Sequence, residues 1–237
     1  MNRYFGWYER KLQDIVPWIE GIERDYPWCP LILSEYGADA NIAHQTELLG
    51  DALDWTSPFY PETFQTKTHE IQWPVIASHP QIIASYLWNM FDFAVPTSKR
   101  GSVEARNMKG LITFDRKTKK DAYYWYKANW SKDPVLYMTQ RRNDRRERRV
   151  TSVTVYSNIG TPRVTLNGRD LGTPRRGTTG VHYVFDNVSL DDGENLLRAS
   201  AADTDGRQLN DTIVWHYDGD CDRSADFSEH EQEHGSW

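Results

Sequence analysis

The sequence predicts an α/β domain followed by an all-β domain. Before about residue 130, apolar runs of strand length alternate with stretches of helical periodicity, which is typical of α/β proteins. After residue 150, short alternating strands are separated by Asn-Gly and Asp-Gly turn signals, which is typical of a small antiparallel sandwich. We therefore expect an α/β domain at 1–130, a linker at 131–149, a sandwich at 150–217 and a disordered tail at 218–237.

The elements of the first domain follow from hydrophobic spacing. Apolar residues at helical spacing predict a helix from Leu12 to Tyr26, which Pro27 ends. A buried strand is expected at 31–35. The polar, aperiodic stretch 42–66 is interpreted as a long excursion over the strand ends, because such loops are usually functional or disordered.

The second half of this domain repeats the pattern. A helix is expected at 68–78, although Pro74 argues against it. A buried strand follows at 81–93 and ends among aromatic and polar residues, and a short apolar piece occupies 111–114. A helix at 121–130 completes the order helix, strand, helix, strand, helix, which places both strand ends on one side.

Glu35 ends the first strand, in the motif Ser34-Glu35-Tyr36-Gly37. In barrels of parallel strands, catalytic groups lie at the carboxyl ends of the strands, so Glu35 is a candidate catalytic carboxylate. The alternative is a strand that is followed by a solvated acid.

Composition and charge exclude several classes of function. The chain has 237 residues and a net charge of −6, so it has no overall basic field for nucleic acid or anionic lipid. No apolar run approaches the roughly 18 residues of a membrane span. Cys29 and Cys221 have neither metal-type nor redox-type spacing, and we expect no metal and no cofactor.

The segment 141–149 is a charge run with the sequence RRNDRRERR. It could form an anion-binding patch. A solvated linker or an exposed edge strand is the favoured interpretation, because acids lie inside the run and the whole chain is acidic.

Four motifs together carry a family resemblance. They are Asn2–Tyr8, Ser34–Gly37, Leu87–Phe93 and Asn107–Lys117, in this order. The stretch 1–130 resembles the second half of the catalytic barrel of glycoside hydrolase family 2, the β-galactosidase and β-glucuronidase family. The sandwich after it resembles the immunoglobulin-like domain that follows the barrel in many bacterial members. The implied fold is the C-terminal portion of a TIM (β/α)8 barrel, its last two to three βα units, followed by that sandwich.

The resemblance implies that Glu35 is the nucleophile of a retaining glycosidase and that Tyr4 donates its hydroxyl to it. Trp88 would form a wall of the sugar subsite. The alternative for Tyr4 and Trp88 is that each fills the core.

Other motif residues are implied substrate contacts. Asn2 and Tyr8 are candidates, and Asn107 with Lys109 would meet a sugar carboxylate or hydroxyl. Similar Asn-x-Lys sequences occur in β-glucuronidases and in β-galactosidase-like members, so we expect a β-galactoside as substrate and keep a uronide as the alternative. A surface lysine is the structural alternative for Lys109.

One departure from the family concerns the second carboxylate. In the family, the general acid/base is a glutamate directly after an asparagine, upstream of the nucleophile, and no acid before Glu35 has that neighbour here. We therefore expect a fragment of a larger glycosidase, inactive alone, whose partner is the missing N-terminal half. A non-catalytic module that binds carbohydrate or packs against other domains is the alternative of another class.

Overall fold

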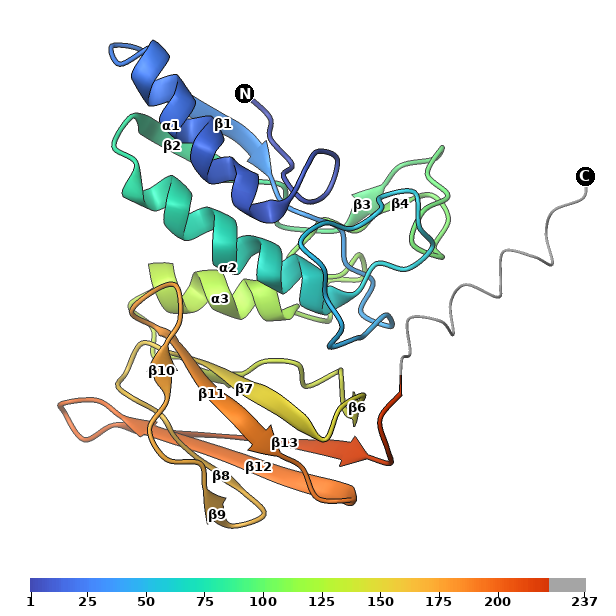
Figure 1. Cartoon of the computed structure of the whole chain (residues 1–237), viewed down its shortest axis with the longest axis vertical. Coiled ribbons are helices and arrows are strands. Elements are labelled where there is room, and N and C mark those ends of the chain that lie inside the picture. Colours follow the sequence, from blue (N-terminus) through green and yellow to red (C-terminus); the bar gives the residue numbers. More distant parts are fainter. Residues whose placement is uncertain (222–237) are drawn as a thin grey trace, which may run out of the picture. The chain divides into compact units, whose positions relative to one another are not determined.

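The computed structural model describes residues 1–221, which form two compact units (Figure 1). The first unit comprises Met1–His44 and Leu48–Ala122, and the second comprises Gln45–Glu47 and residues 123–221. Each unit has its own cluster of buried apolar side chains. The predicted α/β and all-β parts are therefore both present, although the division falls at residue 122 and not at 130.

A strand–helix–strand motif forms the centre of the first unit. Strands β1 (Leu31–Tyr36) and β2 (Ile82–Leu87) are parallel, and the helix α2 (Glu62–Ser78) lies between them in the chain. Residues 1–3 run beside β1, since Ser34 N donates to Met1 O at 2.8 Å and Arg3 N to Glu35 O at 2.9 Å. The chain therefore places three parallel segments side by side, with the ends of β1 and β2 at the same edge.

The helix α1 (Ile15–Asp25) precedes β1 and is introduced by a short 3-10 turn, η1 (Leu12–Asp14). Its buried positions include Ile15 and Ile19, four residues apart, as the sequence predicts. Tyr26 N donates to Ile22 O at 2.8 Å and closes the last turn just before Pro27.

The helix α2 begins six residues earlier than predicted and contains Pro74. Its buried face is largely polar, which is why hydrophobic spacing gave a weak signal. Gln65 Nε2 donates to Ala38 O at 2.8 Å, and Gln72 Nε2 donates to Phe5 O at 2.7 Å. These glutamines tie the helix to the loops that leave the strand ends.

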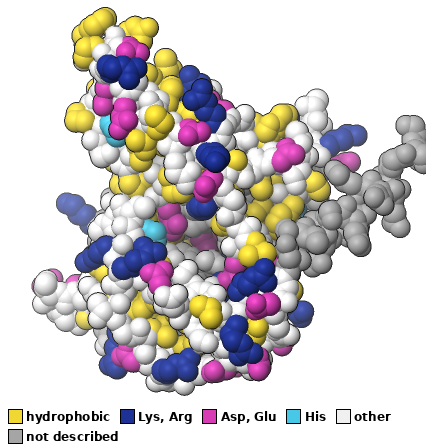
Figure 2. Space-filling view, viewed as in Figure 1, with side chains coloured by type: hydrophobic (Ala, Val, Ile, Leu, Met, Phe, Trp, Pro, Cys, Tyr) yellow, Lys and Arg dark blue, Asp and Glu magenta, His cyan; other side chains and the backbone are white. Residues whose placement is uncertain are grey.

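Short elements complete the first unit. Strands β3 (Phe93–Ala94) and β4 (Arg106–Asn107) form a small antiparallel pair, and the helix α3 (Asp121–Trp130) begins at the end of this unit. Hydrophobic side chains are exposed around α1, β1 and β2 (Figure 2). Those with the largest exposure there are Tyr26, Trp28, Ile32, Ile83 and Tyr86.

The second unit consists of two sheets that enclose one core. The orders are β10-β11-β7-β5 and β6-β13-β12-β8-β9. The bounds are β5 Leu136–Met138, β6 Arg145–Arg146, β7 Val150–Ser157, β8 Arg163–Leu166, β9 Arg169–Asp170, β10 Arg175–Arg176, β11 His182–Ser189, β12 Gly193–Ala202 and β13 Gln208–Tyr217.

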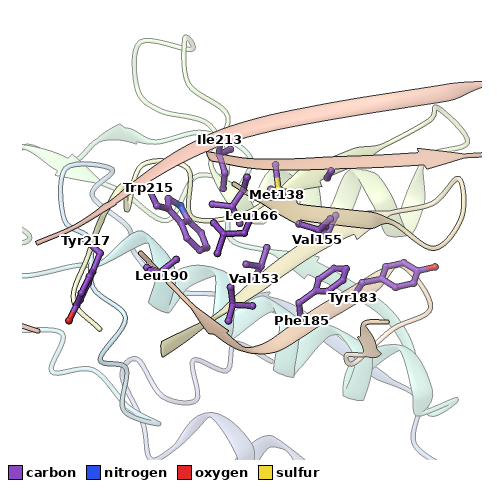
Figure 3. Close-up of a cluster of buried hydrophobic side chains, with 14 residues drawn as sticks. Met138, Val153, Val155, Leu166, Tyr183, Phe185, Leu190, Ile213, Trp215 and Tyr217 are labelled. Atoms are coloured by element: carbon purple, nitrogen blue, oxygen red, sulfur yellow. The ribbon is translucent and has the colours of Figure 1, made fainter. Parts of the chain in front are cut away.

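Both sheets contribute alternate side chains to this core (Figure 3). Val153 and Val155 enter from one sheet and Leu166 and Trp215 from the other, and each is at most 1% exposed. Asn167, at a φ of 50°, begins the turn between β8 and β9, as its Asn-Gly sequence predicts. The second unit therefore has two sheets around one core, the arrangement that its turn signals predict.

The stretch 131–149, predicted as a linker, carries β5 and β6, which are strands of the two sheets. The charge run within it contains the edge strand β6, in line with one of the two favoured interpretations, but one of its arginines is buried. Arg146 is 2% exposed, pairs with Glu47, and lies 3.9 Å from the ring centroid of Trp215. Burial lowers the pKa of Arg146, and the Glu47 carboxylate opposes that shift. Most of the tail expected at 218–237 lies outside the described residues.

The TIM-barrel and immunoglobulin-like assignments stay predictions, since the first unit contributes a βαβ motif and the second a two-sheet sandwich. Within residues 1–221, no helix is long and apolar enough to cross a membrane.

We expect Leu197→Ala to destabilise the second unit by about 2–5 kcal/mol, because this leucine is fully buried between the sheets and truncation leaves a cavity. Hydrogen exchange of the β12 amides measures the free energy of opening in that unit. Leu196→Ala, on the opposite face of the same strand, is the matched control and should cost less than about 1 kcal/mol. Equal losses for the two variants would contradict this description of the core.

Candidate active site

The carboxylate of Glu35 lies where β1 meets the N-terminal segment. Tyr4 Oη donates to Glu35 Oε2 at 2.6 Å. Tyr4 is 8% exposed and Glu35 is half-buried, so the hydroxyl is held in place and the carboxylate stays accessible. The structure thus brings together two residues that are 31 positions apart, as the resemblance implied.

Burial, followed by the hydrogen bond to Glu35, raises the pKa of the Tyr4 phenol above its usual value. The proton therefore stays on Tyr4, and the phenol donates to the carboxylate over a wide pH range. A donor of this kind orients a carboxylate without removing its charge, which a carboxylate nucleophile requires.

A tight turn fixes Tyr4. Its backbone N–H donates to Glu9 Oε1 at 2.9 Å, and Trp7 N donates to Tyr4 O at 3.0 Å. Glu9 also forms an ion pair with Arg3 at 3.2 Å. Glu9 therefore holds the turn, which gives a structural role to the one upstream acid that lies outside the predicted helix.

Gly37 allows the ends of β1 and β2 to approach each other. Its φ is +140°, and a Cβ at this position would lie 2.7 Å from the carbonyl oxygen of Trp88. Trp88 N donates to Tyr36 O at 2.8 Å, which continues the strand pairing up to this point. The Trp88 ring packs on the cluster that contains Tyr4 and meets Phe93 edge-on at 5.9 Å. Its role as a wall for a sugar stays a prediction.

Lys109 is buried, at 2% exposure, among charged and aromatic groups. Its Nζ forms an ion pair with Asp39 and donates to Tyr8 Oη at 3.0 Å. It also lies 5.6 Å from the ring centroid of Tyr4, which itself meets the Tyr8 ring edge-on at 5.1 Å. The alternative of a solvated surface lysine is therefore wrong, and the Lys109 ammonium belongs to the same cluster as Tyr4.

Asn107 and Asn2 have local partners. Asn107 Oδ1 accepts a hydrogen bond from Lys109 N at 3.0 Å and shapes the turn that presents the lysine. Asn2 Oδ1 accepts from Ser34 Oγ at 2.6 Å, next to Glu35. Both asparagines keep their side-chain N–H groups for other partners, and a role in binding substrate stays a prediction for each.

A cavity of about 230 Å³ opens beside Lys109. Three predicted site residues line it, namely Tyr8, Asn107 and Lys109. The other lining residues are Asp39, Tyr60, Val95, Thr97, Ser98, Arg100 and Arg106. Its charged groups are three cations and one carboxylate. The cavity therefore combines hydrogen-bonding groups with a positive balance of charge.

A second buried ion pair, Lys120–Asp92, supports the backbone next to this cavity's Asp39 and Lys109. Lys120 Nζ donates to Asp92 Oδ1 at 2.9 Å and to the carbonyl oxygens of Ala40 and Met108, each at 2.8 Å. These carbonyls adjoin Asp39 and Lys109. Burial lowers the pKa of Lys120 and raises that of Asp92, and each partner's charge opposes the shift of the other.

Sequence reasoning missed several groups at this site. Asp39 carried a usable signal, since it follows Gly37 in the loop at the end of the first strand. Arg100 and Arg106 lie in what the sequence shows only as a charged loop. Lys120 stands in a polar stretch before a helix, where a lysine is normally solvated, and its burial could not be foreseen.

Comparison with known proteins identifies the relatives of this chain. No family model matches it. A β-glucuronidase from Bacteroides fragilis is 34% identical over 92% of the chain and 31% of its own length. A solved structure from the same species, described as a "putative beta-galactosidase", is 68% identical with a TM-score of 0.93, over 95% of this chain and 33% of its own.

A third relative is the Bacteroides uniformis β-glucuronidase 2, solved with cyclophellitol-6-carboxylate aziridine covalently bound. It is 27% identical with a TM-score of 0.73, over 92% of this chain and 26% of its own.

These relatives define the class: the fold and sequence of the chain are those of a segment found in β-glycosidases. More particularly, over more than nine tenths of its length the chain matches one part of bacterial β-glucuronidases and of a β-galactosidase-like protein, and so resembles part of a glycoside hydrolase family 2 enzyme. It spans about a third of the length of the relatives that it matches.

The raised pKa of Tyr4 predicts a pH-dependent contribution to folding. The folded state holds the phenol proton more tightly than the unfolded chain does. The contribution is therefore fully present below the unfolded pKa of about 10 and is lost as the pH rises through the higher folded pKa.

We expect Tyr4→Phe to flatten the fall in free energy of unfolding above about pH 9.5, as measured by urea denaturation at several pH values. Tyr26→Phe, at an exposed tyrosine, is the control and should keep the slope of the unaltered chain. An unchanged slope in Tyr4→Phe would show that this phenol is not specially held.

Proposed function

We propose that this chain supplies the nucleophile of a retaining β-glycosidase and that Glu35 is this nucleophile. The observation that carries the proposal is the Tyr4 hydroxyl donating to Glu35 at 2.6 Å, at the end of a parallel strand. The covalent complex of the related B. uniformis β-glucuronidase is consistent with chemistry that passes through an enzyme-bound species.

In the proposed reaction, the Glu35 carboxylate is the nucleophile. One carboxylate oxygen attacks the anomeric carbon, a carbon–oxygen bond to the enzyme forms, and the bond to the leaving oxygen breaks as that oxygen takes a proton from a second carboxylic acid. Water then displaces the carboxylate, and the second residue takes up the proton of that water. Tyr4 keeps its own proton and orients the carboxylate oxygen between these steps.

The second carboxyl group would have to lie about 5–5.5 Å from Glu35. Asp39 is occupied by Lys109 and Met108 N, and Glu9 is occupied by Arg3 and Tyr4 N. We propose that the acid/base comes from the rest of a larger enzyme. Its further parallel segments would cover the exposed apolar side chains of β1 and β2, such as Ile32 and Ile83.

The cavity beside Lys109 favours a β-glucuronide or a related uronide as the substrate. The buried Lys109 ammonium, with Asn107 beside it, would bind a sugar carboxylate by charge-assisted hydrogen bonds. A β-galactoside, the substrate expected from the sequence, is the second candidate, which the description of the 68%-identical structure favours.

The assignment of Glu35 as the nucleophile is tested in the larger enzyme, which contains this chain together with the segment that supplies the acid/base. Glu35→Gly should lower kcat for an aryl β-glycoside by about 10⁴-fold or more, because the covalent step is lost. Azide should restore turnover and give a glycosyl azide of inverted anomeric configuration, since the small anion attacks from the face that the carboxylate occupied. Turnover that survives Glu35→Gly without azide would disprove the assignment, and Glu20→Gln, at an exposed carboxylate on α1, is the matched control.

The substrate is tested with paired aryl β-glucuronide and β-galactoside in the same enzyme. For a uronidase, Lys109→Met should lower kcat/KM for the glucuronide by about 10²-fold, the worth of a hydrogen bond to a charged group, and change the galactoside rate far less. A preference for the galactoside that Lys109→Met leaves unchanged would establish the second candidate. Failure of both substrates, with Glu35 unaltered, would favour a non-catalytic module.

A further inference from the structure

Arg100 and Arg106 remain unexplained by the proposed reaction. Both line the cavity that contains Lys109. Lys109 is paired with Asp39, but within residues 1–221 no carboxylate forms an ion pair with either arginine. With Lys109 they give this cavity three cations against the single carboxylate of Asp39, so an anion bound there would be attracted by the excess positive charge.

Aromatic rings hold both guanidinium groups by their faces. Arg100 Cζ lies 4.2 Å from the ring centroid of Trp55, and Arg106 Cζ lies 4.6 Å from that of Phe114. Stacking uses the flat face of a guanidinium and leaves its N–H edge available for hydrogen bonds. The rings thus position the two guanidinium groups, and their N–H groups can still donate to a ligand, which suits the bidentate binding of a carboxylate or a sulfate.

The loop that carries Arg100 is fixed by its neighbour Gly101. Gly101 has a φ of +61°, and a Cβ there would overlap the ring of Tyr60 and lie 2.6 Å from Met108 Cε. Asn41 Nδ2 donates to Gly101 O at 3.0 Å, and Ser102 Oγ donates to Pro58 O at 3.1 Å. The backbone next to Arg100 is therefore anchored to the body of the unit.

Arg106 is held by sheet pairing. It lies on β4 opposite Ala94, one residue before Asn107, and its side chain is half-buried. It also lines a second cavity of about 230 Å³ on the side of Asp92 and Asp115. Arg106 therefore forms part of the wall between two cavities, next to the turn that presents Lys109.

We propose that Arg100 and Arg106 form a second anion-binding subsite, so that the substrate is an acidic oligosaccharide with a sulfate ester or carboxylate in addition to the uronate. The inference rests on the proposed function, because Lys109 and Asn107 are taken to meet the uronate itself. It extends the substrate from a simple glycoside to a glycan fragment with at least two negative charges.

The test measures binding to the 237-residue chain at low ionic strength by isothermal titration calorimetry and by the Nε–H signals of the arginines in NMR. The probes are a β-glucuronyl disaccharide with one sulfate ester on the reducing sugar, its unsulfated twin, a diuronate of the same length, and inorganic sulfate. The sulfated or the diuronate probe should bind at least about tenfold more tightly than the unsulfated twin and shift the Arg100 signal.

Three variants separate the two subsites. Arg100→Gln should abolish the tenfold ratio and leave binding of the unsulfated twin within about twofold. Lys109→Met should weaken both disaccharides and retain the ratio. Lys99→Gln is the control, because it removes the same charge from an exposed neighbour that does not line the cavity, and it should change neither quantity.

The outcomes are distinguishable. Equal affinity for all disaccharides, or a ratio that Arg100→Gln leaves intact, would overturn the second subsite and leave the proposed uronate site standing. Binding of the sulfated probe and inorganic sulfate without any binding of the unsulfated twin would support the arginine subsite and overturn the uronate site at Lys109. No binding of any probe would overturn both. A ratio that shrinks as salt is added would support direct charge recognition by the exposed Arg100.

Discussion

The close approach of the two strand ends at Gly37 is the constraint on which the first unit depends. A side chain at this position would meet the carbonyl oxygen of Trp88, so the parallel pairing of β1 and β2 can reach their ends only with glycine. That pairing fixes the direction in which β1 ends, and Glu35 is the next-to-last residue of this strand. Residues 1–3, hydrogen-bonded along the other side of β1, then place Tyr4 against the carboxylate.

Charge is distributed unevenly around this centre. The ion pairs Lys109–Asp39 and Lys120–Asp92 are both buried, so neither is a simple source of stability, because two desolvated charges roughly offset their own attraction. Their value is geometric. Lys120 fixes the carbonyl groups beside Asp39 and Lys109, and the Lys109 ammonium then has a defined place between Asp39, Tyr8 and the cavity.

The parts of the structure that could be predicted from sequence were those with a local signal. Apolar runs marked β1 and β2, turn dipeptides marked the sandwich, and the motif around Glu35 marked the strand end. The start of α2 was missed because Gln65 and other polar residues of its first turns face inward, and Gln65 bonds to a backbone carbonyl, so no apolar stripe marks these turns. The strand β6 within the predicted linker was not foreseen, because Arg146 has a buried partner, Glu47, about a hundred residues earlier in the chain. Such pairings over long sequence distances leave no periodic trace.

The loop that carries Arg100 joins the body of the unit through different residues from those that hold Tyr4 and Glu35. Gly101 and Ser102 attach it to Asn41 and Pro58, whereas Glu9 and the edge of β1 hold the tyrosine and its carboxylate. The proposed recognition of charge and the proposed glycosyl transfer would therefore depend on separable stretches of chain. Under both proposals, exchange of residues 95–106 for another loop of the same length would change which glycans are accepted and leave the reaction centre unaltered.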